Sequence, residues 1–312
     1  MTDISELAEK LRSRGARTVA LQFPAGLKRR SMAVATALEK EGFFVVISGD
    51  PCYGACDLSL DLLAYADVLV HFGHTPLVRH EDVIYEPCLV DFDPGIVRKA
   101  FPFFSGSTIG LVTTVQHIQM IEECARVLRS SGFEVMVRPG NERTPEPGQV
   151  LGCSFSAARV PGATDILYIG TGLFHPLGVS LASGTRVVAL DPLSGEVQVV
   201  DADRFIRKRH ALVEKSRDAP VFGVIVSRKP GQNRYALAER LVSLGRTAFI
   251  VFMDEVTPAE LLNLGFPAYV NTACPRLAYD DQIRFPVPVL TPFEFEILVG
   301  LRNWEEYRMD EI

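Results

Sequence analysis

Residues 17–49 of the sequence read RTVALQFPAGLKRRSMAVATALEKEGFFVVISG, and they set a pattern that recurs along the chain. The stretch opens with a short apolar strand, passes through a loop, and continues with apolar residues at helical spacing. The helical part ends near Gly42, and a second apolar strand follows it. A strand, a helix and a strand in this order predict a βαβ unit with parallel strands.

The same pattern occurs twice more. Residues 107–140 read STIGLVTTVQHIQMIEECARVLRSSGFEVMVRPG, and residues 219–253 read APVFGVIVSRKPGQNRYALAERLVSLGRTAFIVFM. The helical part ends at or near a glycine in both copies, Gly132 or Gly245. In the second copy the apolar residues at helical spacing are Ile118, Ile121, Ala125 and Leu128. Each copy is followed by a third strand and a loop, in ADVLVHFGH (66–74), TDILYIGTG (164–172) and FPAYVNTACP (266–275).

This threefold repeat predicts an α/β fold with three homologous Rossmann-like domains, at residues 1–103, 104–203 and 204–312. Each domain is expected to contain a parallel sheet with right-handed crossovers. Ligands of such sheets bind beyond the carboxyl ends of the strands. We therefore expect the three domains to surround a pseudo-threefold axis and to direct those ends into one central cavity.

The composition is that of an ordinary soluble protein. The 312 residues are 47% hydrophobic and 22% charged, with a net charge of −6 and no basic block that would indicate nucleic-acid binding. The first 15 residues carry mixed charges and lack the apolar region of a signal peptide. No apolar run approaches the roughly 20 residues that a membrane span requires. We expect a cytoplasmic protein whose six cysteines are thiols or metal ligands rather than disulfides.

Three cysteines occupy comparable places in the three repeats. Cys56 lies 11 residues before Asp67, and Cys153 lies 12 residues before Asp165, where the two acids open the third strands. Cys274 follows the third strand of the last repeat. Each of these loops is at the carboxyl end of a strand. The fold would therefore bring one thiol from each domain to a common centre.

The remaining cysteines leave alternatives open. Cys52 lies in the same loop as Cys56, and the repeat only mildly favours Cys56. Cys88 and Cys124 are most simply small core residues, since thiols are among the most buried side chains. From spacing alone, six incidental thiols are as good an interpretation as a metal centre.

Three thiolates from distant parts of a chain suit an iron–sulfur cluster better than zinc. Structural zinc takes four ligands, typically in local pairs, and only Cys52 and Cys56 form such a pair. A 4Fe–4S cluster held by three cysteines leaves one iron open to a substrate. Cys274 precedes Pro275, so it is predicted to cap a helix whose dipole favours a thiolate.

Six motifs stand out along the chain: LQFPAGL (21–27), YGACD (53–57), HFGH (71–74), GTGLFHPLG (170–178), KPGQNR (229–234) and ACPR (273–276). In this order they make the chain resemble the archaeal diphthamide-biosynthesis enzymes of the subunit-two type. The resemblance covers essentially the whole chain, and YGACD with ACPR is its most specific part. It implies a homodimer with a 4Fe–4S cluster that is held by Cys56, Cys153 in LGCSF, and Cys274.

The resemblance also implies the reaction. Such enzymes are 2-(3-amino-3-carboxypropyl)histidine synthases, in which a reduced cluster cleaves S-adenosylmethionine between its sulfur and the γ-carbon of its methionine part. The resulting 3-amino-3-carboxypropyl radical adds to a histidine of translation elongation factor 2, which is the first step of diphthamide biosynthesis. An external electron donor is implied as a further partner, and the protein's contribution is to position the reacting groups.

The loop SRKPGQNR, residues 227–234, is our candidate for binding the carboxylate of S-adenosylmethionine. It follows the strand FGVIV and offers backbone N–H groups together with Arg228, Lys229 and Gln232. The alternative is that the two cations are solvated and that Gln232 only caps the following helix.

The loop GTGLFHPLG is a second candidate. Its glycines, Gly172 among them, let the backbone approach a ligand closely, and His175 is either a substrate contact or bonded to the backbone. His71 and His74 lie in the equivalent loop of the first domain and are interpreted as structural or as supporting residues. Arg276 either tunes the cluster or forms a surface salt bridge.

Two other functions stay open at this point. A quinolinate-synthase-like enzyme would also have three pseudo-symmetric domains and a cluster held by three cysteines, but its motifs differ and it needs no sulfonium site. A non-catalytic, cluster-bearing partner subunit is the second alternative. Binding of S-adenosylmethionine by the reduced protein would exclude the quinolinate-synthase-like enzyme. Activity of the purified chain on its own would exclude the non-catalytic partner subunit.

Overall fold

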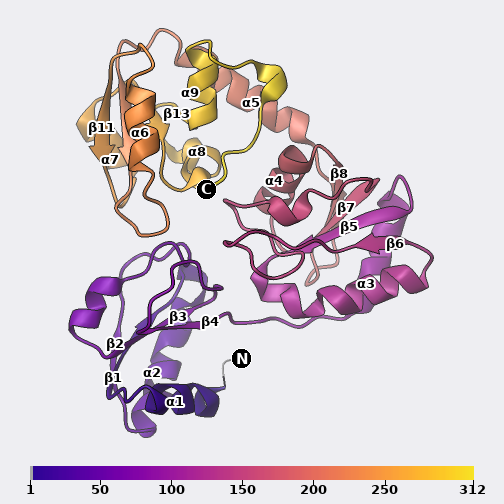
Figure 1. Ribbon diagram of the computed structural model, residues 1–312, viewed down its shortest axis with the longest axis vertical. Coiled ribbons are helices and arrows are strands. Elements are labelled where there is room, and N and C mark those ends of the chain that lie inside the picture. Colours follow the sequence, from indigo (N-terminus) through magenta and orange to yellow (C-terminus); the bar gives the residue numbers. More distant parts are fainter. Residues whose placement is uncertain (1–2) are drawn as a thin grey trace. The chain divides into compact units, whose positions relative to one another are not determined.

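The computed structural model describes residues 3–312, which contain three β-sheets with helices packed against them (Figure 1). The chain forms two compact units. The first comprises residues 3–92 together with Val115–Met120, and the second comprises Asp93–Thr114 and Ile121–Ile312. The first unit contains one sheet, and the second contains two.

The first sheet has the strand order β2-β1-β3-β4, and all of its neighbouring strands are parallel. Its strands are β1 (Thr18–Gln22), β2 (Phe44–Ile47), β3 (Val68–Phe72) and β4 (Val83–Glu86). Its helices are α1 (Ile4–Ser13), α2 (Ser31–Lys40) and the 3-10 helices η1 (Ala25–Arg30) and η2 (Leu60–Ala64). The apolar faces of α1 and α2 pack on β1 and β3, which are buried along nearly their whole length.

The second sheet has the order β6-β5-β7-β8-β9. Its strands are β5 (Thr108–Thr113), β6 (Glu134–Met136), β7 (Asp165–Ile169), β8 (Arg186–Leu190) and β9 (Val197–Val199). The helices near it in sequence are η3 (Pro94–Phe103), η4 (Val115–Met120), α3 (Ile121–Ser130), η5 (Ser156–Ala158) and α4 (Phe174–Ser183). The strand β9 pairs antiparallel with β8, so the expectation of a purely parallel sheet is wrong at this edge.

The third sheet has the order β11-β10-β12-β13 and is parallel. Its strands are β10 (Phe222–Val226), β11 (Ala248–Phe252), β12 (Ala268–Asn271) and β13 (Val289–Leu290). Its helices are α5 (Ala202–Lys215), α6 (Tyr235–Val242), α7 (Pro258–Leu264), α8 (Pro275–Tyr279), α9 (Pro292–Leu298) and the 3-10 helices η6 (Asp281–Arg284) and η7 (Trp304–Glu306).

The common strand order bears out the repeat and the α/β class. In each sheet the first two strands of the repeat are neighbours, and the third lies on the other side of the first. Each sheet falls inside one of the three predicted domain ranges, whose boundaries stay a prediction. The carboxyl ends of the central strands lead into the loops that contain the motifs.

The helix of the second repeat begins later than its apolar spacing suggests. Ile121, Ala125 and Leu128 are buried on one face of α3, as predicted. Ile118 lies before the helix, in the 3-10 helix η4. Among residues 3–312, no helix is both long enough and apolar enough to cross a membrane.

Candidate functional site

Cys56 lies half-buried in the loop that follows β2. The carboxylate of Asp57 accepts a hydrogen bond from the backbone N–H of Tyr53 at 3.2 Å, which closes the turn around the thiol. The buried amide of Gln22, at the end of β1, donates to the carbonyl oxygen of Asp57 at 2.8 Å and to the hydroxyl of Ser59 at 2.9 Å. The turn is therefore anchored to a central strand of its sheet.

Two histidines support Gln22 from the other side. His71 Nδ1 lies 2.8 Å from Gln22 Oε1, so its N–H donates to this oxygen and leaves Nε2 to accept from His74 Nδ1 at 2.9 Å. Burial, with a smaller contribution from His74, lowers the pKa of His71 to about 3. Burial also lowers the pKa of His74 to about 4. Both imidazoles are neutral at physiological pH and hold the Cys56 loop in place, which agrees with their interpretation as supporting residues.

Cys153 lies in the long connection between β6 and β7. Burial raises the pKa of its thiol, whereas the guanidinium groups of Arg143 and Arg234 act in the opposite direction. Arg143 lies close enough to lower the pKa of the thiol, and it donates a hydrogen bond to the carbonyl oxygen of Gly231 at 3.0 Å. Its Nε is buried and has no hydrogen-bond partner within residues 3–312. The surroundings of Cys153 are thus cationic and hold one unused donor.

Cys274 is the N-cap residue of α8, as predicted, and Pro275 is the first residue of this helix. The side chain of Asn271, at the end of β12, holds the loop: its amide donates to the carbonyl oxygen of Cys274 at 2.8 Å, and its oxygen accepts from the N–H of Ala273 at 3.0 Å. The strand β12 therefore fixes the direction in which α8 begins.

Three motif loops of the second unit meet at Gly152, the residue before Cys153. A Cβ atom at this position would lie 2.8 Å from the ring of Phe174 and 3.0 Å from Cδ of Arg276. The guanidinium of Arg276 stacks over the Phe174 ring at 4.8 Å and pairs with Asp280 at 2.6 Å. The loops LGCSF, GTGLFHPLG and ACPR are thus in direct contact. Arg276 forms the salt bridge that was one of its two expected roles, and its effect on a cluster stays a prediction.

The predicted carboxylate loop has its cations already engaged. Arg228 is 70% exposed and pairs with Asp254 at 2.5 Å, while Lys229 is largely buried and pairs with Glu255 at 2.6 Å. Gln232 is 4% exposed, and its backbone N–H donates to the carbonyl oxygen of Lys229 at 3.0 Å. Both cations therefore already have a carboxylate partner within the protein.

The glycine-rich loop leads into α4. Gly172 has a φ of +74° and open space around it, so a ligand can approach its backbone. His175 lies in the first turn of α4 and stacks on Tyr168 at a ring separation of 6.2 Å. Burial, and then the charge of Arg276, lowers the pKa of His175 to about 4. His175 is therefore a neutral side chain packed beside Arg276.

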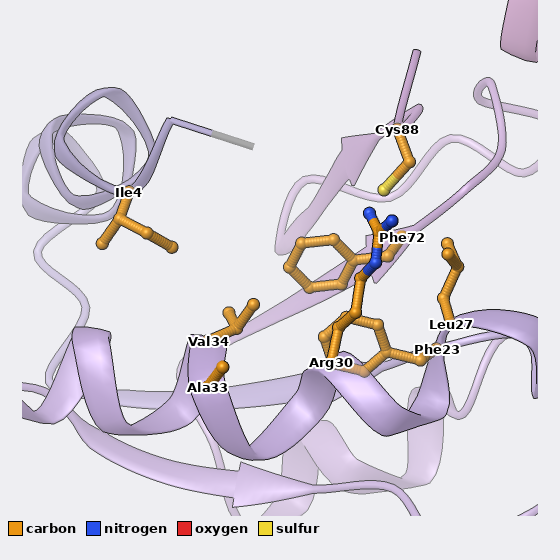
Figure 2. Close-up of a pocket in the computed structure, with 8 residues that line it drawn as sticks. All are labelled: Ile4, Phe23, Leu27, Arg30, Ala33, Val34, Phe72 and Cys88. Carbon is orange, nitrogen blue, oxygen red and sulfur yellow. The ribbon is translucent and has the colours of Figure 1, made fainter. Parts of the chain in front are cut away.

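The other three cysteines are buried or half-buried. Cys124 is fully buried in α3, as predicted, and burial raises the pKa of its thiol to about 12. Cys52 is buried in the turn of Cys56. Cys88 has a left-handed φ of 54° and borders a pocket of about 320 Å³ (Figure 2). The pocket is lined by Ile4, Phe23, Leu27, Arg30, Ala33, Val34, Phe72 and Cys88.

Sequence reasoning missed three residues that organise the second unit. The charge of Arg143 acts on the Cys153 thiol, and Arg234 pairs with Asp310 at 2.6 Å. Arg234 is the last residue of KPGQNR, a motif in which the sequence pointed to Lys229 and Gln232 instead. Arg143 and Asp310 stand outside every motif. Within residues 3–312, no three His, Cys, Asp or Glu side chains gather as a site for a single metal ion.

Comparisons with known proteins connect this site to a chemistry. Residues 23–308 match the family described as "Putative diphthamide synthesis protein". The chain is 41% identical to the 2-(3-amino-3-carboxypropyl)histidine synthase of Pyrococcus horikoshii, over 99% of this chain and 92% of that protein. It is 30% identical to the 2-(3-amino-3-carboxypropyl)histidine synthase subunit 1 of Gallus gallus, over 99% of this chain and 79% of that protein.

The fold agrees with these matches. The crystal structure of Dph2 from Pyrococcus horikoshii with a 4Fe–4S cluster has a TM-score of 0.94 and 40% identity, and the match covers 100% of this chain and 94% of that one. A second crystal structure of Dph2 from the same organism has a TM-score of 0.92. Motifs, fold and sequence identity agree over the full length, and the chain belongs to the diphthamide synthesis protein family.

Proposed function

We propose that the chain is a 2-(3-amino-3-carboxypropyl)histidine synthase that modifies a histidine of translation elongation factor 2. The observation that supports this proposal most strongly is the 41% sequence identity, over 99% of the chain, to the Pyrococcus horikoshii enzyme of that name. The bond between the sulfonium sulfur and the γ-carbon of S-adenosylmethionine breaks, and a bond from that γ-carbon to the imidazole ring forms. The ring loses a proton and 5′-methylthioadenosine leaves, so the overall transfer is redox-neutral.

The proposed ligands of a 4Fe–4S cluster are Cys56, Cys153 and Cys274. Two features of the chain suit an anionic cluster. The positive charge of Arg143 lowers the pKa of the Cys153 thiol, and its buried Nε, which has no partner within residues 3–312, would be available to a cluster sulfur, where hydrogen bonds tune the reduction potential. Cys274 stands at the N-cap of α8. The three cysteines would each bind a different iron of the 4Fe–4S cluster. They therefore need not lie as close together as the ligands of a single metal ion.

When bound and reduced, a cluster would supply one electron for cleavage of the carbon–sulfur bond, and the modified ring would give one electron back as it loses its proton, so no net electron is consumed. The chain's own residues would orient the substrate, so that the bond to the γ-carbon rather than the bond to the ribose carbon is the one that breaks. Arg143, with its unused Nε, adds positive charge beside Cys153 and favours the thiolate over the thiol.

For S-adenosylmethionine we propose two loops. The loop of Arg228, Lys229 and Gln232 would take the carboxylate, chiefly through the buried Gln232 and backbone N–H groups, because both cations have carboxylate partners. The loop of Gly172 and His175 would approach the remainder of the substrate, since Gly172 is open and His175 is neutral. The further proposed partners are an external electron donor and a second copy of the chain in a homodimer.

The test is anaerobic assay of the purified chain with dithionite, S-adenosylmethionine and elongation factor 2. We expect 5′-methylthioadenosine and an elongation factor that is heavier by one aminocarboxypropyl group. Iron and sulfide analysis of Cys56→Ala, Cys153→Ala and Cys274→Ala should report loss of the cluster, whereas Cys52→Ala and Cys88→Ala should retain it. The opposite pattern would reassign the ligands.

The same assay separates the alternatives. A quinolinate-synthase-like enzyme would not bind S-adenosylmethionine when reduced. A non-catalytic partner subunit would carry the cluster but form no 5′-methylthioadenosine on its own.

A further inference from the structure

Residues near the end of the described chain run beside the Cys153 loop. The backbone N–H of Ile312 donates to the carbonyl oxygen of Cys153 at 2.9 Å. The carboxylate of Glu311 accepts from the backbone N–H of Phe155 at 2.7 Å. This segment is therefore attached to the loop at the cysteine itself and two residues beyond it.

The same segment is attached to the loop of Cys274 through Arg234. Asp310 forms a two-point ion pair with Arg234, at 2.6 and 2.8 Å, and both side chains are mostly buried. Arg234 Nε donates to the carbonyl oxygen of Thr272 at 2.7 Å, and its NH2 group donates to that of Ala273 at 3.1 Å. These are the two carbonyl groups directly before Cys274.

Arg234 uses its whole guanidinium in this way. Its five N–H donors serve Thr272, Ala273, both oxygens of Asp310, and the carbonyl oxygen of Glu311 at 3.4 Å. Lysine has three donors on a single atom and cannot reproduce this fork. Asp310 neutralises the positive charge of Arg234. What an arginine offers here beyond a lysine is therefore the arrangement of its five donors, which fixes the positions of the groups that accept from them.

The helix after Cys274 is fixed by the same segment. The backbone N–H of Asp310 donates to the hydroxyl of Tyr279, the last residue of α8, at 2.8 Å. Met309 is buried in one core cluster with Phe155 and Tyr279. Four residues thus tie the Cys153 loop, the approach to Cys274 and the end of α8 into one assembly.

We propose that Arg234 and Asp310 are positioning residues for the iron–sulfur centre, which hold the loops of Cys153 and Cys274 at the separation that one cluster needs. This inference rests on the proposed function, in which these two cysteines are ligands. Neither residue binds the cluster itself. Their loss lets the two loops move apart while each loop keeps its own local structure.

The experiment compares Arg234→Lys and Asp310→Asn with the wild-type chain after anaerobic reconstitution with iron and sulfide. We expect iron to be lost to a chelator about tenfold faster from either variant, as is typical when the residues that orient metal ligands are changed. The EPR spectrum of the reduced cluster should also change. Urea denaturation of the cluster-free proteins gives the free energy of unfolding of each variant, so that a loss of stability can be distinguished from a loss of iron.

Glu296→Gln is the matched control. Glu296 is also a buried carboxylate, and it pairs with Arg240 and Arg302. This variant should lose iron at the wild-type rate even where its stability falls. Wild-type iron retention and an unchanged spectrum in Arg234→Lys and Asp310→Asn would overturn the positioning role alone. A wild-type chain that takes up no iron and sulfide would overturn the proposed function and this role with it.

Discussion

The Nε2 atom of His71 lies 2.9 Å from Nδ1 of His74, and the pair connects through Gln22 to the turn that contains Cys56. One N–H donates and one ring nitrogen accepts, so this contact requires at least one neutral imidazole. A proton added to His71 Nε2 would face the N–H of His74 and break the chain of hydrogen bonds. The geometry therefore predicts how the stability of the first unit depends on pH.

Stability should fall as the pH drops below the ordinary histidine range. The pKa of His71 is lowered to about 3 in the folded chain, whereas it is about 6.5 when unfolded. Between these values the unfolded state binds more protons, so acid favours unfolding by about 2 kcal/mol per buried histidine from pH 7.5 to pH 5. Chemical denaturation at both pH values measures this. A His71→Gln/His74→Gln variant should have a shallower dependence, and the exposed His80→Gln should match the wild type.

Cys124→Ser should destabilise the second unit without affecting binding of the proposed cluster. The thiol is fully buried in α3, so a hydroxyl there is desolvated and costs about 1–3 kcal/mol. Cys124→Ala should cost less, since it only leaves a small void. Urea denaturation and iron analysis of both variants provide the measurement. Loss of iron from Cys124→Ala would show that this cysteine takes part in the metal site.

Gly152→Ala should disturb the contact between the motif loops. The added methyl group would lie 2.8 Å from the ring of Phe174, so that ring or the neighbouring Arg276 has to shift. Overpacking of this kind costs about 1–3 kcal/mol and here would also move Cys153. Iron content should fall together with stability. Gly26→Ala, where the new methyl group meets open space, is the control and should change neither quantity.

The sequence predicted best those features that depend on neighbouring residues. The βαβ order follows from local periodicity, and the N-cap position of Cys274 follows from the proline after it. The ion pairs between residues far apart in the sequence were not predictable, unlike the local salt bridge of Arg276 with Asp280. Arg228 meets Asp254 after 26 residues, and Arg234 meets Asp310 after 76. No local pattern encodes such partners, because the packing of separate elements selects them. The antiparallel strand β9 was missed because three residues give too short a pattern.

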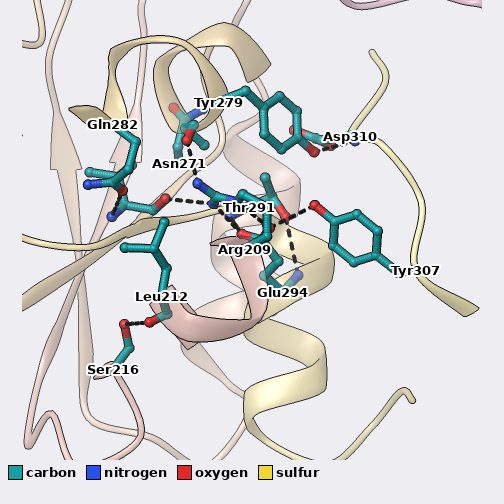
Figure 3. A network of polar contacts seen from close by, with 12 residues as sticks. Arg209, Leu212, Ser216, Asn271, Tyr279, Gln282, Thr291, Glu294, Tyr307 and Asp310 are labelled. Carbon is teal, nitrogen blue, oxygen red and sulfur yellow. Dashed lines mark hydrogen bonds and ion pairs between the residues drawn. The ribbon is translucent and has the colours of Figure 1, made fainter. Parts of the chain in front are cut away.

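A buried ion pair gives the last prediction. Arg209, in α5, pairs with Glu294 of α9 at 2.5 and 2.7 Å, and both side chains are almost completely buried (Figure 3). Arg209 also donates to the carbonyl oxygens of Ala278 at 2.6 Å and Val289 at 3.0 Å, and the hydroxyl of Tyr307 donates to Glu294 at 2.9 Å. Arg209→Met should cost about 3–5 kcal/mol, because it leaves the Glu294 carboxylate buried without its counter-charge.

The double variant Arg209→Met/Glu294→Met tests this reason. If the cost comes from an uncompensated charge, removal of the second charge should recover part of the stability, and the double variant should be less destabilised than the sum of the single variants. Urea denaturation of the cluster-free proteins measures all three. Strict additivity would mean that the two residues stabilise the chain independently. In that case the hydrogen bonds from Arg209 to the carbonyl oxygens of Ala278 in α8 and Val289 in β13, rather than the ion pair, would account for the stability that Arg209 contributes.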